Sequence, residues 1–142
     1  MADLDAVAGA LAIGPESSAA ERTIDITTYG ARTGRPRRTE VWFHRVEGRW
    51  FLTGVPGRRD WYANLRAHPA FTVHLKNGVR ADLPATAVPV GDEATRRRVI
   101  TAAVGLQDLP HLAGRVPRQD VDTWLAGSPL LEIVFDHDQG AK

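Results

Sequence analysis

The chain has 142 residues, no cysteine, and 18 basic against 17 acidic side chains, so its formal net charge is +1. This length predicts one domain with a single core. The near balance of charge excludes a protein that coats nucleic acid or an anionic membrane with its whole surface, and the lack of cysteine excludes disulfides, a thiol nucleophile and thiolate metal sites.

The first twenty residues predict a short helix and a linker. Leu4, Val7 and Leu11 recur at helical spacing within residues 2–12, which predicts a helix with one apolar face. Residues 16–20 lack this pattern and are expected to form the linker. The sequence has no apolar stretch of transmembrane length and no basic start typical of a signal peptide, so we expect a cytoplasmic protein.

Residues 22–53 alternate between apolar and polar side chains, a pattern typical of half-buried strands. Two of the expected strands flank a basic loop, and the second of them places Trp42 and His44 on one face. Glu47-Gly48 then predicts a tight hairpin into a third strand at residues 49–53. The pattern therefore indicates an antiparallel meander.

The second half of the chain predicts three more strands and three helices. Asp60 is expected to cap a short helix that ends before Pro69, and Asn77-Gly78 joins two further strands. Pro84 and Pro89 predict that the later strand of this pair bends or lies at a sheet edge. The remaining expected elements are a helix at 93–104, an irregular stretch at 106–117, a helix at 120–126, a strand at 130–135 and a disordered tail at 136–142.

Together these elements predict one domain over residues 1–142 with a mainly β, α+β fold. Six short, mostly antiparallel strands with small helices between them favour an antiparallel β-barrel with helical decorations.

The segment TTYGARTGRPRRTEVWF, residues 27–43, contains no acidic residue before Glu40. Gly30 and Gly34 allow sharp turns and the close approach of a ligand to the main chain, and Pro36 stiffens the exit. Guanidinium groups bind phosphate and carboxylate oxygens through paired hydrogen bonds. The loop therefore predicts a site for an anionic ligand, formed by its arginines, Arg32, Arg35, Arg37 and Arg38.

Three segments resemble the deazaflavin-dependent nitroreductase family, whose members use coenzyme F420 on a split β-barrel related to the flavin-binding pyridoxamine phosphate oxidase-like proteins. They are ITTYGARTGRPRRTEVWF (residues 26–43), WFLTGVPGRRDWYANLRAHP (50–69) and, as a weaker match, FTVHLKNGVRADLPATAVPV (71–90). The resemblance implies a six-stranded split β-barrel. It also implies an enzyme that passes a hydride from reduced F420 to an electron-poor small molecule, such as a quinone, a nitro compound or a conjugated enone.

Residue by residue, the resemblance implies that the first segment holds the phosphate and acidic tail of the cofactor, through Arg32, Thr33, Gly34, Arg37 and Arg38. It implies that the next turn and helix lie along the deazaflavin and its ribityl chain, through Val55, Gly57, Arg58, Arg59, Trp61 and Asn64. The turn is compact here, whereas the family often has a longer insertion. No catalytic side chain and no metal ligand is implied.

The resemblance leaves the acceptor side open. The acceptor pocket is expected to be closed by the N-terminal helix, by residues 106–117 with His111 and Leu112, or by a partner subunit of a homodimer. A lipid quinone as acceptor would bring the protein to a membrane surface.

Two other functions fit parts of the pattern. An FMN-dependent split-barrel oxidoreductase would use the same fold with another flavin. Gly34-Arg35-Pro36 resembles the AT-hook that enters the minor groove of A·T-rich DNA. An alternating strand begins within two residues of this motif, so no nucleic acid partner is expected.

Several of these residues also have structural interpretations. Aromatic residues such as Trp61 on a short helix are commonly core residues, and Asn64 can satisfy backbone groups instead of contacting a cofactor. His44 and Tyr62 are alternative proton donors, between which the sequence does not choose. His44 and His74 are expected on neighbouring strands, without the third ligand that a metal would need.

Overall fold

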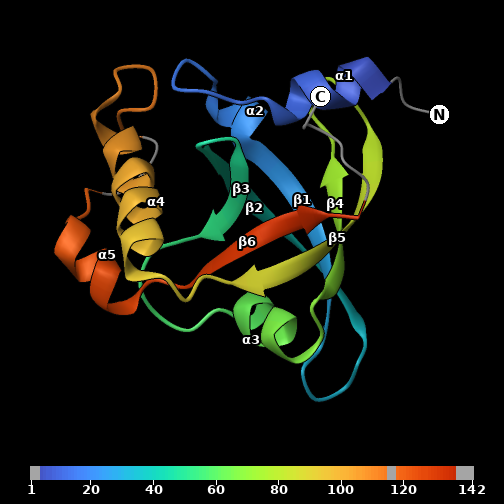
Figure 1. The fold of residues 1–142 in the computed structure, drawn as a ribbon. Coiled ribbons are helices and arrows are strands. Elements are labelled where there is room, and N and C mark those ends of the chain that lie inside the picture. Colours follow the sequence, from blue (N-terminus) through green and yellow to red (C-terminus); the bar gives the residue numbers. More distant parts are fainter. Residues whose placement is uncertain (1–3, 115–117, 137–142) are drawn as a thin grey trace.

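The computed structural model describes residues 4–114 and 118–136, and in this part of the chain six antiparallel strands close into a barrel (Figure 1). Around the barrel the strands follow the order β1-β2-β3-β6-β5-β4. Their bounds are β1 Thr23–Tyr29, β2 Pro36–Val46, β3 Arg49–Thr53, β4 Ala70–Leu75, β5 Ala81–Pro89 and β6 Leu130–Phe135. The predicted six-stranded antiparallel barrel is confirmed, with helix and strand content roughly equal.

The barrel is filled by alternate side chains of its strands and covered at both ends by helices. In β1, for example, every second residue is buried. α1 (Leu4–Leu11) covers one end and α3 (Asp60–Ala67) covers the other (Figure 1). Buried side chains from both helices belong to the same hydrophobic core as the strands: Val7, Leu11, Trp61 and Leu65.

A second hydrophobic core lies outside the barrel, against β3. α4 (Glu93–Gly105) and α5 (Val121–Gly127) pack on each other and cover this wall, and the 3-10 helix η1 (Leu106–Asp108) continues α4 (Figure 1). Phe51 of β3 is buried in this core with Trp124 of α5. The outer face of the barrel is therefore covered by a helical layer at this side.

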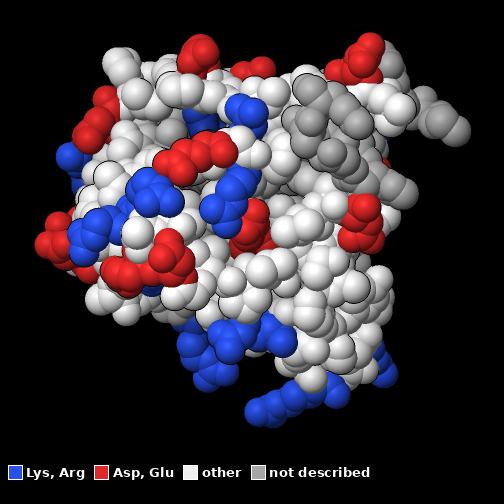
Figure 2. All heavy atoms as spheres, in the orientation of Figure 1, with Lys and Arg blue, Asp and Glu red and all other residues white. Residues whose placement is uncertain are grey.

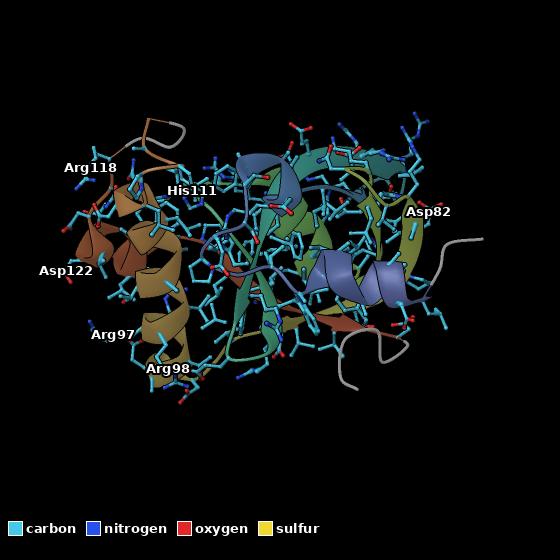
Figure 3. All side chains as sticks on the ribbon, turned by 90° about the horizontal axis from the view of Figure 1, so that it is seen from above. Asp82, Arg97, Arg98, His111, Arg118 and Asp122 are labelled. Carbon is cyan, nitrogen blue, oxygen red and sulfur yellow. The ribbon has the colours of Figure 1, made fainter. Side chains whose placement is uncertain are left out.

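Arg96 holds the two helices of this layer together. Its guanidinium donates to the carbonyl oxygens of Leu125 and Ser128, both at 2.9 Å, at the end of α5. Arg97 and Arg98 instead lie on the outer flank of α4, as Figure 3 shows. The helical layer is thus fixed by a charge-assisted contact as well as by its apolar core.

Two expectations for the N-terminal segment are wrong. Leu4 is 73% exposed, so the buried face of α1 consists of Val7 and Leu11. The expected linker contains a one-turn helix, α2 (Ala19–Arg22), because Ser18 and Glu21 form a capping box. The Ser18 hydroxyl accepts from the Glu21 N–H at 3.1 Å, and the Glu21 carboxylate accepts from the Ser18 N–H at 2.8 Å.

For the later elements, one expectation is wrong and one of two alternatives is excluded. Asp60 is the first residue of α3, and Arg59 is its N-cap, without a side-chain capping hydrogen bond. β5 is not an edge strand, because it pairs with β4 and with β6. The Pro84 carbonyl faces β6 and accepts from the Asp136 N–H at 3.0 Å, beyond the last paired residue of β6. The nitrogen of Pro84 faces the same side, so its missing N–H removes no hydrogen bond from the paired part of the sheet.

α4, with 13 residues, is the longest helix in the described part of the chain, and none of the helices there has the length and hydropathy that a bilayer crossing requires. Of the predicted tail only Asp136 is described, and residues 137–142 lie outside the described residues.

Candidate functional site

A cationic cavity of about 390 Å3 lies at the α3 end of the barrel, beneath the hairpin that joins β1 to β2. Figure 2 shows basic side chains gathered at this end, whereas basic and acidic side chains are mixed over the helical layer. The cavity is lined by three arginines and one aspartate among small and polar residues: Gly30, Ala31, Arg32, Thr33, Arg37, Arg58, Asp60, Ala63 and Asn64. Its lining therefore favours an anion.

The arginines of this cavity are not neutralised by any residue that the structure describes. Among the described residues, Arg32, Arg37 and Arg58 form no ion pair. Arg38, the next residue along β2, instead pairs through Nε with the Asp25 carboxylate at 2.8 Å and does not line the cavity. Neighbouring positions on a strand face opposite sides. The two adjacent arginines of the motif are therefore separated, and Arg37 is the one that faces the cavity.

The β1–β2 hairpin is held in a compact shape by its own backbone. The Gly30 N–H donates to the Arg35 carbonyl, and the Gly34 N–H donates to the Gly30 carbonyl, both at 2.8 Å. Gly34 has a φ of 70°, which favours glycine. A Cβ atom on Gly30 would lie 2.6 Å from the Thr33 hydroxyl oxygen, so a side chain there would force Thr33 to move. Thr33 itself accepts from the Arg35 N–H at 3.2 Å.

Asn64 fixes this hairpin to α3. Its side chain is buried, its Oδ1 accepts from the Ala31 N–H at 2.9 Å, and its Nδ2 donates to the Thr28 hydroxyl at 3.1 Å. Asn64 therefore satisfies buried groups of β1 and of the loop while it lines the cavity. Its observed role is to position the loop.

The turn between β3 and α3, residues 54–59, runs from beside the helical layer to α3 (Figure 1). Arg59 folds back over this turn, and its guanidinium donates to the Val55 carbonyl at 2.9 Å. Gly57, with a φ of 129°, donates from its N–H to the Gly127 carbonyl of α5 at 3.4 Å. Arg58 points instead to the cationic cavity. The turn thus connects α5 and α3.

A second cavity, of about 170 Å3, lies on the other side of this turn, between the barrel wall and the helical layer. Its lining is mainly apolar: Trp42, His44, Thr53, Gly54, Val55, Ala103, Val104, Leu106, Gln107, Gln119 and Trp124. An apolar cavity of about 150 Å3 admits one benzene ring. This second cavity therefore has room for a single six-membered ring.

The far wall of the apolar cavity is fixed by a polar clamp. The Gln107 side chain donates to the Gln119 carbonyl at 2.9 Å and accepts from the Gln119 N–H at 2.6 Å. The Trp124 indole N–H donates to the Gln119 Oε1 at 3.0 Å. These bonds hold the segment before α5 against η1, so the width of the cavity does not depend on apolar packing alone.

His44 is a buried imidazole in the wall of the apolar cavity, with only 8% of its surface exposed. Burial lowers the pKa of His44 to about 4, and the nearby positive charge of Arg22 contributes to the shift. Arg22 is also buried and donates to the carbonyl oxygen of Gly14 at 2.5 Å. At neutral pH, His44 is therefore uncharged, and a protonated His44 as proton donor does not fit this environment.

The other singled-out residues lie away from both cavities. Trp61 is 7% exposed and packs in the barrel core, which supports its structural interpretation. The Tyr62 hydroxyl accepts from the Arg66 guanidinium at 3.0 Å and lines neither cavity. The expectation that His44 and His74 lie on neighbouring strands is wrong, because β1 separates β2 from β4.

His74 has other partners. Its ring nitrogens contact the Thr27 hydroxyl at 2.6 Å and the Asp82 carboxylate at 2.7 Å. No group of three or more His, Asp or Glu side chains in the described ranges could hold a metal ion.

The apolar cavity brings together residues that the sequence interpretation did not select, because Trp42, Ala103, Gln119 and Trp124 come from distant segments. The sequence contained one indication of this cavity. Trp42 and His44 alternate with Phe43, which is buried in the barrel core, so their side chains face the layer outside the barrel. The basic loop, in contrast, is contiguous in sequence.

Residues 10–108 match the family model of the F420H2-dependent quinone reductases. This range contains both the basic hairpin and the turn at residues 54–59, as well as the barrel-wall residues of the apolar cavity.

Solved structures similar to the chain share its fold. A conserved hypothetical protein from Mycobacterium tuberculosis is 22% identical with a TM-score of 0.65, and the match covers 94% of this chain and 80% of that one. A Listeria innocua protein whose name assigns it provisionally to the pyridoxamine 5′-phosphate oxidases is 13% identical, with a TM-score of 0.63 and 94% of both chains covered. A structure named F420 reductase is 16% identical, with a TM-score of 0.52, and covers 81% of this chain and 86% of that one.

Proposed function

The chain belongs to the F420H2-dependent quinone reductase family, an enzyme family that uses coenzyme F420, and on this premise we propose how its two cavities divide the reaction. The cationic cavity holds the phosphate and acidic tail of F420. The apolar cavity holds the quinone ring. The turn at residues 54–59 lies between them and supports the deazaflavin.

The cationic cavity fits the tail of F420 by its charge. Its lining contains one acidic residue, Asp60, and three arginines, Arg32, Arg37 and Arg58. These arginines form no ion pair among the described residues. Phosphate and carboxylate oxygens would give these groups the charge-assisted hydrogen bonds that the described residues do not provide. The compact hairpin, with glycine at 30 and 34, holds Arg32 and Thr33 at the cavity.

This assignment divides the residues implied by the family resemblance into two groups. We propose cofactor contacts for Arg32, Thr33, Arg37 and Arg58, with Gly34 shaping the loop and Val55 beside the ring. Arg59 and Gly57 shape the turn, Asn64 positions the hairpin, and Trp61 supports α3 from the core. Arg38 stabilises the strand pair β1–β2 through Asp25.

When bound, reduced F420 supplies the hydride and the proton that together convert a quinone to a hydroquinone. The chain's own residues would position the acceptor and exclude water. The apolar wall formed by Ala103, Val104 and Trp124 favours a flat hydrocarbon ring over water. Because Val55 and Gly54 line the same cavity, a ring held there lies next to the turn that supports the deazaflavin.

The acceptor wall is therefore assigned to η1 and the segment around α5, not to the N-terminal helix. α1 lines neither of the two cavities and contributes Val7 and Leu11 to the barrel core. The Trp50 indole N–H also donates to the Leu11 carbonyl at 2.8 Å. Deleting residues 1–12 would remove part of the core. This truncation would therefore test folding more than acceptor binding.

One observation carries this proposal. Arg32, Arg37 and Arg58, which form no ion pair among the described residues, line a cavity beside the turn at residues 54–59, and the same turn borders an apolar cavity. Fluorescence titration of the purified protein with F420, and with FMN in parallel, tests it. We expect F420 to bind and FMN to bind at least about tenfold more weakly. Tight FMN binding without F420 binding would contradict the proposal and favour the FMN-dependent alternative.

A further inference from the structure

His44 has an unusual environment for a buried polar side chain. Among the described residues, no hydrogen bond reaches either of its ring nitrogens, although the residue is more than nine-tenths buried. A buried polar group without a hydrogen-bond partner costs the folded state free energy. A ligand that supplies the missing partner would therefore recover this energy when it binds.

The ring nitrogens of His44 remain accessible from a cavity. Within residues 4–114 and 118–136, Ser128 Oγ is the one side-chain polar atom that is fully buried and has no hydrogen bond. The His44 nitrogens also have no hydrogen bond, but they do not belong to this class. They therefore keep some accessible surface. His44 lines the apolar cavity and also a hollow of about 250 Å3 beside Arg22 and Leu109, so its nitrogens are reached from one or both of these cavities.

The other buried polar groups of this cavity are already used. The Thr53 hydroxyl donates to the Pro129 carbonyl at 2.6 Å, and the Gln107 side chain is occupied on both sides by Gln119. The Trp124 indole N–H is bound by the Gln119 side chain. His44 is thus the most buried polar lining residue that can still offer a hydrogen bond to a ring in the cavity.

We infer that His44 is a specificity-determining residue that donates a hydrogen bond to a carbonyl oxygen of the acceptor in the apolar cavity. This inference rests on the proposed function, because it requires the acceptor to occupy that cavity. Uncharged imidazole carries one N–H donor, which suits a carbonyl oxygen. The low pKa of His44 is consistent with this role, because the side chain keeps its uncharged form throughout the neutral range.

The role predicts a preference among acceptors. A hydrogen bond to the carbonyl withdraws electron density from the ring, so it favours hydride acceptance by quinones and conjugated enones. A nitroaromatic ring of similar size would gain less from a donor placed for a carbonyl. His44 therefore selects acceptors with a ring carbonyl among molecules that fit the cavity.

The test compares His44→Leu, which removes the polar group, with His44→Gln, which keeps an N–H donor of similar reach. Infrared difference spectra of carbonyl-labelled 1,4-benzoquinone are recorded with each protein in the presence of oxidised F420, so that no turnover occurs. We expect the carbonyl band of bound 1,4-benzoquinone to lie lower in the wild-type protein and in His44→Gln than in His44→Leu. In turnover assays, kcat/KM for 1,4-benzoquinone should fall about tenfold in His44→Leu and recover at least partly in His44→Gln.

Two results would overturn the inference. One is a carbonyl band in His44→Leu at the wild-type position, and the other is the absence of any bound carbonyl band in a wild-type protein that binds F420. F420 titration of the same three proteins tests the proposed function independently of the role of His44, because all three proteins should bind F420 equally. A wild-type protein that fails to bind F420 contradicts the proposed function itself, whereas F420 binding with an unchanged carbonyl band contradicts the role of His44 alone.

Discussion

The two cavities on either side of the turn at residues 54–59 are built in opposite ways. The cationic cavity has mostly exposed walls from two short segments, residues 30–37 and 58–64, and its charged side chains form no ion pair among the described residues. The apolar cavity has mostly buried or half-buried walls from both halves of the chain, and the polar groups of Thr53, Gln107 and Trp124 find their hydrogen-bond partners within the protein. The first is suited to hold a charged group from solvent, and the second to exclude water from a ring.

This difference has an energetic consequence. Exposed arginines cost the fold little, so substitutions there should affect ligand affinity and leave stability nearly unchanged. Ala103, Val104 and Trp124 of the apolar cavity belong to the second core, so substitutions of these residues should affect both ligand affinity and stability. Variants on the two sides should therefore separate cofactor binding from acceptor binding.

The largest effect is expected from the double substitution of Arg37 and Arg58 by alanine. Each loses charge-assisted hydrogen bonds of about 1.5 kcal/mol or more, so F420 affinity should fall by more than about 100-fold, with little change in Tm. Fluorescence titration measures the affinity. Arg38→Ala is the matched control, because Arg38 pairs with Asp25 outside the cavity. Equal losses in the Arg38 variant would show that only overall charge matters.

The second prediction concerns stability below neutral pH. His44 has a folded pKa of about 4, below its ordinary value of 6.5. The unfolded chain therefore binds a proton that the native state does not, and stability should fall as the pH drops from about 6.5 toward 4, by about 3 kcal/mol in total. Urea unfolding between pH 7 and pH 4.5 measures this slope. The slope should flatten in His44→Gln, and an unchanged slope would contradict the account of His44.

The third prediction concerns the connection between the two regions. Asn64→Ala leaves the Ala31 N–H and the Thr28 hydroxyl without their partner. We expect a loss of about 2 kcal/mol in unfolding free energy and a weaker affinity for F420, because the hairpin is no longer held to α3. Chemical denaturation and F420 titration measure the two effects. Retained F420 affinity in a destabilised variant would show that Asn64 serves the core alone.

The smallest effect is expected in the apolar cavity. Ala103→Leu adds apolar volume to its wall, so KM for a quinone should rise about tenfold, while F420 affinity stays within about twofold. Ala94→Leu, at an exposed position on the same helix, is the matched control. Steady-state kinetics at saturating F420 measure the change. A loss of F420 affinity with unchanged quinone KM would place the cofactor ring, not the acceptor, in this cavity.

The same contrast explains what the sequence could predict. The barrel strands and the basic hairpin follow from local patterns, because alternation and turn residues act over a few positions. The different roles of Arg37 and Arg38 were not predicted. Strand alternation implies that they face opposite sides, but the pairing of Arg38 with Asp25 depends on the register of the neighbouring strand, which the sequence does not give.

The apolar cavity could not be predicted from local patterns. Its walls combine Trp42, Ala103 and Trp124, which meet only when α4 and α5 pack on the barrel. The role of Asn64 depends on the same kind of tertiary contact, because its partners Ala31 and Thr28 lie more than thirty residues earlier. The position of α1 on the barrel core likewise changed the expected acceptor wall.

A crystal structure of the complex with oxidised F420 tests the central division most directly. The account predicts the phosphate and acidic tail at Arg32, Arg37 and Arg58, and the deazaflavin along Gly54 and Val55 with the apolar cavity open beside it. A tail bound away from these arginines, or a deazaflavin ring that fills the cavity between His44 and Trp124, would contradict it.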